Sequence, residues 1–101
     1  HGHIDFTQTA QAVHNRVRGT NPWPGAFALL DGEPLKLWQT RIVETRAGGA
    51  PGSCFGDVKS GLFVACGDGA VCLTDVQPEG KKRMPAAAFA HGYRVETGGV
   101  L

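Results

Sequence analysis

The stretch Arg16-Val-Arg-Gly-Thr-Asn-Pro-Trp-Pro-Gly-Ala26 divides the chain into a helical part and a strand-rich part. Pro22 and Pro24 fix their own φ angles at about −65° and push the residue before each of them out of the helical region. A helix that arrives from the N-terminal side must therefore end before Asn21, and Asn21 and Trp23 are both expected to be extended. Gly25 allows the chain to turn, because it carries no Cβ.

The residues before this connector predict one helix over about 8–18. Its apolar stripe follows the spacing of one helical face and consists of Ala10, Val13 and Val17. We expect the hydroxyl of Thr7 to cap the first turn, since threonine accepts hydrogen bonds from free backbone N–H groups at helix starts. Gly19 is expected to end the helix.

The residues after the connector predict about five or six short antiparallel strands and one short late helix. Fifteen glycines and six prolines in 101 residues favour short strands joined by turns. Asp31-Gly32 and Gly67-Asp-Gly69 are hairpin signals, and Gln77-Pro-Glu-Gly80 is expected to end the last long strand. The expected elements are strands over 26–30, 35–44, 53–58, 62–66 and 70–76 and a helix over about 85–91. Strands of this number and length favour a small barrel, because closure removes unpaired edges.

The composition indicates a single globular domain that covers residues 1–101. The chain is 42% hydrophobic and 19% charged, which suits a folded domain rather than a disordered one. Ten Lys and Arg against nine Asp and Glu leave a net charge of +1, so overall charge argues neither for nor against nucleic acid. No apolar run approaches the roughly 20 residues of a membrane span, and no signal peptide is evident. We therefore expect no membrane association and a cytoplasmic location.

The three cysteines, Cys54, Cys66 and Cys72, are an odd number and contain no CxxC pair. This pattern argues against a disulfide framework and against a zinc site. We expect reduced, partly buried thiols and no bound metal.

No catalytic constellation is evident in the sequence. It contains no GxGxxG or GxxxxGK[ST] phosphate loop, and neither serine lies in a nucleophile elbow. Asp68 and Asp75 have no evident partner. His14 lies beside the helical stripe and His91 at a helix end, where packing or the helix dipole explains it. We expect these residues to contain no active site.

Lys81-Lys82-Arg83 is the local concentration of positive charge. One interpretation is a solvated charge run. The other is a phosphate-binding surface, in which each cation releases counterions from a polyanion. The side chains that would extend this surface, if the fold brings them to one side, are Arg16, Arg18, Lys36 and Arg41. Trp23 and Trp38 either pack in the core or stack on bases.

Several motifs occur in a fixed order along the chain: Asn21-Pro-Trp-Pro-Gly-Ala26, Ala65-Cys-Gly-Asp-Gly-Ala70 and Val76-Gln-Pro-Glu-Gly-Lys-Lys-Arg-Met84. With Ile4-Asp-Phe6, Arg16-Val-Arg18 and Leu35-Lys-Leu37, they resemble the C-terminal domain of methionyl-tRNA formyltransferase over nearly the whole chain. The first two motifs are specific to the formyltransferase superfamily. The third points to its tRNA branch.

The resemblance implies a mainly β fold: a small open antiparallel β-barrel, similar to an OB-fold, behind one N-terminal helix and with one short late helix. It also implies that the catalytic residues and the folate pocket lie in a preceding N-terminal domain absent from this chain. The parent enzyme would use 10-formyltetrahydrofolate to formylate initiator Met-tRNA in translation initiation, and this domain would bind no cofactor. In the family the barrel presents basic side chains to tRNA, which here are Lys81, Lys82 and Arg83, with Arg16, Arg18 and Lys36 as further candidates.

An alternative remains from a different class of protein. The chain could be a structural domain that packs on the catalytic domain of a sugar or folate formyltransferase or hydrolase, with no nucleic-acid contact. Trp23 and Pro24 would then be docking residues, and the basic loop would be solvated. A continuous positive face that joins Lys81–Arg83 to Arg16 or Lys36 favours tRNA, whereas scattered charges favour packing.

Overall fold

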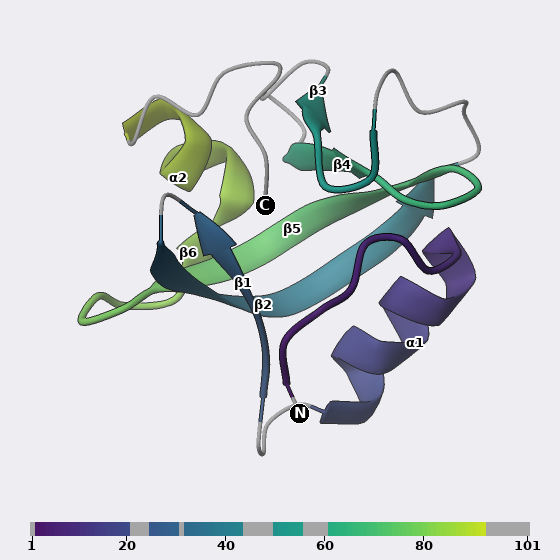
Figure 1. Ribbon diagram of the computed structural model, residues 1–101. Helices are drawn as coiled ribbons and strands as arrows, with labels where there is room; N and C mark the ends of the chain where they lie inside the picture. The colour runs from purple at the N-terminus through teal and green to yellow at the C-terminus, as the bar shows by residue number, and fades with distance from the viewer. Residues whose placement is uncertain (1, 21–24, 31, 44–49, 56–60, 93–101) are drawn as a thin grey trace.

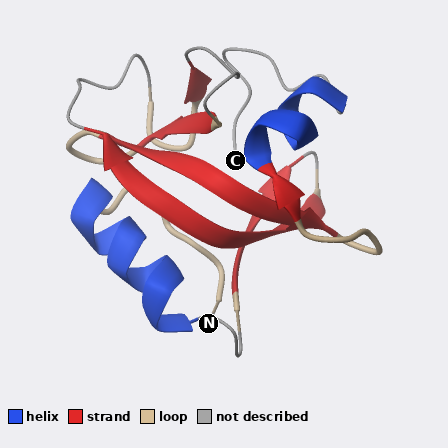
Figure 2. Ribbon diagram, turned by 180° about the vertical axis from the view of Figure 1, so that it is seen from behind, coloured by secondary structure: helices blue, strands red, loops and turns tan. Residues whose placement is uncertain are grey.

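The computed structural model describes residues 2–20, 25–30, 32–43, 50–55 and 61–92, which form a curled antiparallel sheet and two helices (Figure 1). The elements in chain order are α1 Ala10–Thr20, β1 Ala26–Leu30, β2 Glu33–Val43, β3 Cys54–Phe55, β4 Leu62–Ala65, β5 Ala70–Pro78, β6 Met84–Pro85 and α2 Ala86–Gly92. Helix α1 packs mainly on β2 and α2 mainly on β5. Seen from either side, the two helices flank the long β2–β5 ribbon (Figure 2).

The sheet has the strand order β1-β2-β5-β4-β3, and β6 pairs with β5. Every strand pairing is antiparallel. The described parts of β1 and β3 lie at opposite ends of this order and do not pair with each other, so the sheet is an open half-barrel. The expected architecture, mainly β with one N-terminal helix and one short late helix, is confirmed.

The N-terminal arm lies along the outer edge of β1. The backbone N–H of Ile4 donates to the carbonyl of Phe27 at 2.9 Å, and the N–H of Phe27 donates to the carbonyl of Gly2 at 2.8 Å. These bonds use backbone groups of β1 that would otherwise form an unpaired edge. The His3 and Phe27 rings stack beside them, with centroids 5.2 Å apart.

The apolar stripe of α1 is confirmed: all three predicted residues, Ala10, Val13 and Val17, are buried against the sheet. The predicted cap is wrong. Thr9, not Thr7, accepts a hydrogen bond from the N–H of Ala12 at 3.0 Å. Thr7 is occupied elsewhere, because its N–H and its hydroxyl both donate to Asp5 Oδ1, at 3.0 and 2.6 Å. These bonds also hold the pKa of Asp5 below its ordinary value.

The C-terminal end of α1 differs slightly from the prediction. The helix continues past Gly19 to Thr20, whose hydroxyl donates to the carbonyl of Arg16 at 2.8 Å. The carbonyl of Thr20 then accepts from the N–H of Gly25 at 2.8 Å, so the helix end is linked directly to the start of β1. Residues 21–24, which include Trp23 and both prolines of the connector, lie outside the described residues.

Both predicted hairpins are present. The pairing of Leu30 with Glu33 leaves a two-residue connection, in which Gly32 has a φ of +82°. The second hairpin joins β4 to β5 and does more than turn the chain. Asp68 Oδ1 accepts from the N–H of Ala10 at 2.7 Å, and the N–H of Gly67 donates to the carbonyl of Gln8 at 2.8 Å. Asp68, for which the sequence offered no partner, thus caps α1 from across the fold.

The later boundaries differ from the sequence prediction by one or two residues. Strand β5 continues to Pro78, because Gln77 and Pro78 pair with Lys36 and Leu35 of β2. Pro85 belongs to β6, where it pairs with Asp75, and α2 therefore starts at Ala86. The predicted strand over 53–58 is described only as Cys54–Phe55; residues 44, 56–58 and 93–101 lie outside the described residues.

The three cysteines are buried and free. Burial raises the pKa of Cys54 and of Cys66 to about 11 and also raises the pKa of Cys72. The thiolate is the reactive form of cysteine, so these residues behave as small apolar side chains.

We expect the folded chain to react slowly with a thiol reagent at pH 8 and to lose stability as the pH rises from about 9 to about 11. The ordinary pKa of 9.0 applies to the unfolded thiols, which therefore lose their protons first. The measurement is urea unfolding at pH 8 and pH 10. A Cys54→Ala/Cys66→Ala variant should lose less stability over the same range, and an equal loss would contradict the assignment.

Two glycines give a matched pair of substitutions. A Cβ at Gly67 would lie 2.2 Å from the carbonyl oxygen of Thr7, whereas a Cβ at Gly19 meets nothing within 4 Å. Gly67→Ala should therefore lower the thermal midpoint and loosen α1 from the hairpin. Gly19→Ala should stabilise the protein by up to about 1 kcal/mol, because alanine is the better helix former. If Gly67→Ala raised the thermal midpoint as Gly19→Ala should, the close packing of the hairpin against Thr7 would be contradicted.

Candidate nucleic-acid interface

Two of the predicted cations lie over one aromatic ring. Trp38 is half-buried on β2, and the Lys36 Nζ atom lies 4.0 Å from the centre of its ring. The Arg83 Cζ atom lies 4.9 Å from the same centre. Lys36 reaches the ring because residues two apart on a strand share a face, and Arg83 reaches it from the loop before β6. The aromatic face attracts both charges.

Two polar residues of β5 complete this arrangement. Trp38 Nε1 donates to Gln77 Oε1 at 2.9 Å, and Gln77 Nε2 donates to the carbonyl of Lys81 at 2.9 Å. Asp75 Oδ2 accepts from Arg83 Nε at 2.9 Å and from Arg83 Nη2 at 2.7 Å. We refer to Lys36, Trp38, Asp75, Gln77 and Arg83 as the Trp38 cluster. It joins β2 and β5 to the loop between β5 and β6, which carries Lys81, Lys82 and Arg83 and which we call the basic loop.

A double irregularity in the β2–β5 ladder places Trp38. Leu37 pairs with Val76 and Gln39 pairs with Asp75, so Trp38 is an extra residue of β2. A bulge of this kind bends a strand and redirects its side chains. Beyond the bulge, Thr40 Oγ1 lies 2.7 Å from His14 Nδ1 of α1. Leu35 and Leu37 are buried on the opposite face of β2, and no feature of the sequence indicates the bulge.

Lys81 and Lys82 are exposed in the loop between β5 and β6. The N–H of Lys81 donates to the carbonyl of Pro78 at 3.0 Å, which closes a turn in which Gly80 has a φ of +76°. Among the described residues, no acidic side chain lies within ion-pair distance of either lysine. Both ammonium groups are therefore available to an external anion.

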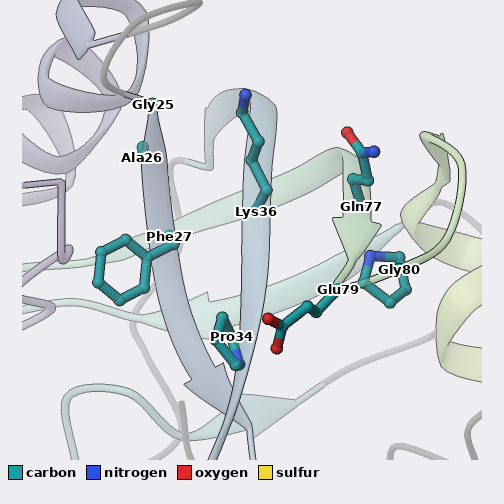
Figure 3. A pocket seen from close by; sticks show the side chains of 9 residues that line it. Gly25, Ala26, Phe27, Pro34, Lys36, Gln77, Glu79 and Gly80 are labelled. Atoms are coloured by element: carbon teal, nitrogen blue, oxygen red, sulfur yellow. The ribbon is translucent and has the colours of Figure 1, made fainter.

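A hollow of about 370 Å³ borders the Trp38 cluster, between β1, β2 and the end of β5. Lys36 and Gln77 extend in the same direction from neighbouring strands, and the carboxylate of Glu79 lies at the other end of the hollow (Figure 3). Phe27 contributes an aromatic ring to the lining. The charged residues that line this hollow are thus one cation, Lys36, and one acid, Glu79.

The remaining candidate cations lie apart from this cluster. Arg16 lines a different hollow, of about 310 Å³, with residues of the N-terminal arm such as Asp5. Arg18 is exposed in the last turn of α1, and no hydrogen bond or ion pair of the described residues joins it to the Trp38 cluster. The structure thus links the basic loop to Lys36 through Gln77 and Trp38, and it pairs Arg83 of that loop with Asp75. Sequence reasoning missed Asp75, Gln77 and the part played by Trp38, since only the strand pairing reveals them.

Other site chemistry finds little support in the described residues. Asp68 caps α1, Asp75 pairs with Arg83, and His14 bonds to Thr40. Within the described ranges, no three His, Cys, Asp or Glu side chains gather as a metal site would require, and no helix is long and apolar enough to cross a membrane. Asp68, Asp75 and His14 are therefore each engaged within the protein.

Comparison with known proteins identifies the family. The family model described as formyl transferase, C-terminal domain, matches residues 1–94. The methionyl-tRNA formyltransferase of Citrifermentans bemidjiense is 46% identical over 101 residues, which are 99% of this chain and 31% of that protein. That of Solibacter usitatus is 49% identical over 94 residues, 93% of this chain and 30% of that protein. The chain thus spans about a third of the length of these relatives.

A solved structure shares the fold. HypX from Aquifex aeolicus, in complex with tetrahydrofolic acid, superimposes with a TM-score of 0.76 at 21% identity, over 94% of this chain and 18% of HypX. At that identity the likeness concerns the fold alone. The match of the family model to residues 1–94 is the decisive finding, and by it the chain belongs to the family of formyl transferase C-terminal domains.

Proposed function

We propose that this chain is the non-catalytic, tRNA-binding domain of a cytoplasmic methionyl-tRNA formyltransferase and that it positions initiator Met-tRNA for N-formylation. The observation that carries the proposal is the basic loop, in which Lys81 and Lys82 are exposed and no described acidic side chain pairs with them; the loop is linked through the Trp38 cluster to Lys36. The names of the similar proteins supply the substrate.

The proposed contact is with the phosphate backbone. Lysine ammonium groups on a surface bind phosphates without reading sequence, so they fix the position and orientation of a nucleic acid. Each phosphate neutralised releases condensed counterions, which makes such binding strongly dependent on salt. A domain of this kind adds affinity and orientation, and the reaction itself takes place elsewhere.

The transfer chemistry would belong to the catalytic domain of the same enzyme. That domain would hold 10-formyltetrahydrofolate and the acid–base residues. The partners of this chain would then be the catalytic domain and the tRNA.

A second candidate is a purely structural domain that packs on the catalytic domain of a sugar or folate formyltransferase. It is favoured by the acids beside the basic residues, because Asp75 pairs with Arg83 and Glu79 lines the adjacent hollow. Salt-dependent tRNA binding separates the two candidates.

The test is tRNA affinity of the intact enzyme, measured against salt concentration. Lys81→Ala/Lys82→Ala should weaken binding and should reduce the slope of log K against log salt by roughly 1.4 to 1.8, since each phosphate contact contributes about 0.7 to 0.9. The KM for the folate should stay unchanged. Wild-type affinity and slope in this variant would overturn the proposal.

The matched control is Arg18→Ala/Arg41→Ala, which removes the same charge at exposed positions outside the Trp38 cluster. We expect a smaller change in the slope. An equal change would mean that general electrostatic attraction, and not the basic loop, holds the tRNA.

A further inference from the structure

We propose that Arg83 is a positioning residue and not a phosphate contact, and that Asp75 and Trp38 hold it so that Lys36, Lys81 and Lys82 make the phosphate contacts. This inference rests on the proposed function and distinguishes the residues that contact phosphate from those that position them. It assigns Asp75, an acid inside a basic surface, a supporting part in tRNA binding.

The contacts of Arg83 commit its guanidinium within the protein. Nε and Nη2 both donate to one oxygen of Asp75, at 2.9 and 2.7 Å, and Cζ lies 4.9 Å from the centre of the Trp38 ring. Arginine binds phosphate best through parallel N–H donors of its planar fork. Here one edge of the fork faces a carboxylate that already neutralises its charge, so a phosphate would gain little at this position.

The ion pair serves geometry more than stability. The side chains of Arg83 and Asp75 are 41% and 32% exposed, and pairs this exposed contribute little to the free energy of folding. What the pair does is fix the end of the basic loop beside β5, directly before Met84 pairs with Val76.

The other end of the loop is fixed from the same ring. Trp38 Nε1 bonds to Gln77, and Gln77 bonds in turn to the carbonyl of Lys81. The loop is therefore attached to Trp38 at Lys81, through Gln77, and after Lys82, through Arg83. Lys36, whose ammonium lies over the same ring, belongs to the same frame. The backbone that carries Lys81 and Lys82 is thus held in place before the ligand arrives, which lowers the cost of ordering the loop on binding.

The experiment compares salt-dependent tRNA binding by the intact enzyme in matched variants. Lys81→Gln and Lys82→Gln should each reduce the slope of log K against log salt by about 0.7 to 0.9. Arg83→Gln should weaken binding roughly two- to tenfold without that change in slope. Asp75→Asn should also weaken tRNA binding roughly two- to tenfold. The Arg83→Gln/Asp75→Asn double variant should bind no more weakly than either single variant, because both substitutions break the same ion pair.

Glu79→Gln is the control for charge, since it removes an acid that makes no described ion pair. It should strengthen binding slightly, opposite to the effect of Asp75→Asn. Arg83→Lys is the second control. It keeps the charge but loses the fork, and should behave like Arg83→Gln.

The inference is overturned if Arg83→Gln lowers the slope as the lysine variants do, if Asp75→Asn strengthens binding, or if Arg83→Lys behaves as the wild type. Each of these results would make Arg83 a phosphate contact restrained by Asp75, with the proposed function intact. If the wild-type enzyme binds tRNA without salt dependence, and the lysine variants do not differ from it, the proposed function itself fails.

Discussion

The antiparallel pairing of β2 with β5 is the constraint on which the rest of the molecule depends. These are the two longest strands, and their ladder runs from Leu35↔Pro78 to Val43↔Ala70. One face of the ladder buries Leu35, Leu37 and Val76 in the core. The other face carries Lys36, Trp38 and Gln77. The core and the candidate interface thus lie on opposite faces of the same pair of strands. The bulge at Trp38 interrupts the regular pairing between these strands.

This arrangement explains which features the sequence could predict. The stripe of α1, the two hairpins and the mainly β content follow from local spacing and turn chemistry, which a sequence displays directly. The open form of the sheet was implied by the family resemblance, whereas strand number alone favoured closure. The capping by Asp68 and the pair between Asp75 and Arg83 could not be predicted, because each depends on which strands become neighbours. Thr7 was misjudged because α1 begins two residues later than predicted, at Ala10, so that Thr9 is the threonine that directly precedes the helix. The site contacts that could not be predicted are therefore those between residues that are far apart in sequence and are brought together by strand pairing.

The same distinction applies to the basic residues. In the sequence there is one uniform run of basic residues, Lys81, Lys82 and Arg83. In the fold they divide into two exposed ammonium groups and one guanidinium that faces an acid and a ring. In the proposed function, the contacts around Trp38 would hold the loop that carries these charges where a polyanion could bind.

The bond between Asp68 and the backbone of Ala10 has a consequence for the way the chain assembles. The two residues are 58 positions apart, and closing a loop of that length costs entropy before any contact rewards it. During synthesis the segment of α1 leaves the ribosome long before the β4–β5 turn exists. A helix of 11 residues is marginal on its own in water. Stable docking of α1 therefore awaits the β4–β5 hairpin, and pairing between segments this far apart in sequence slows folding.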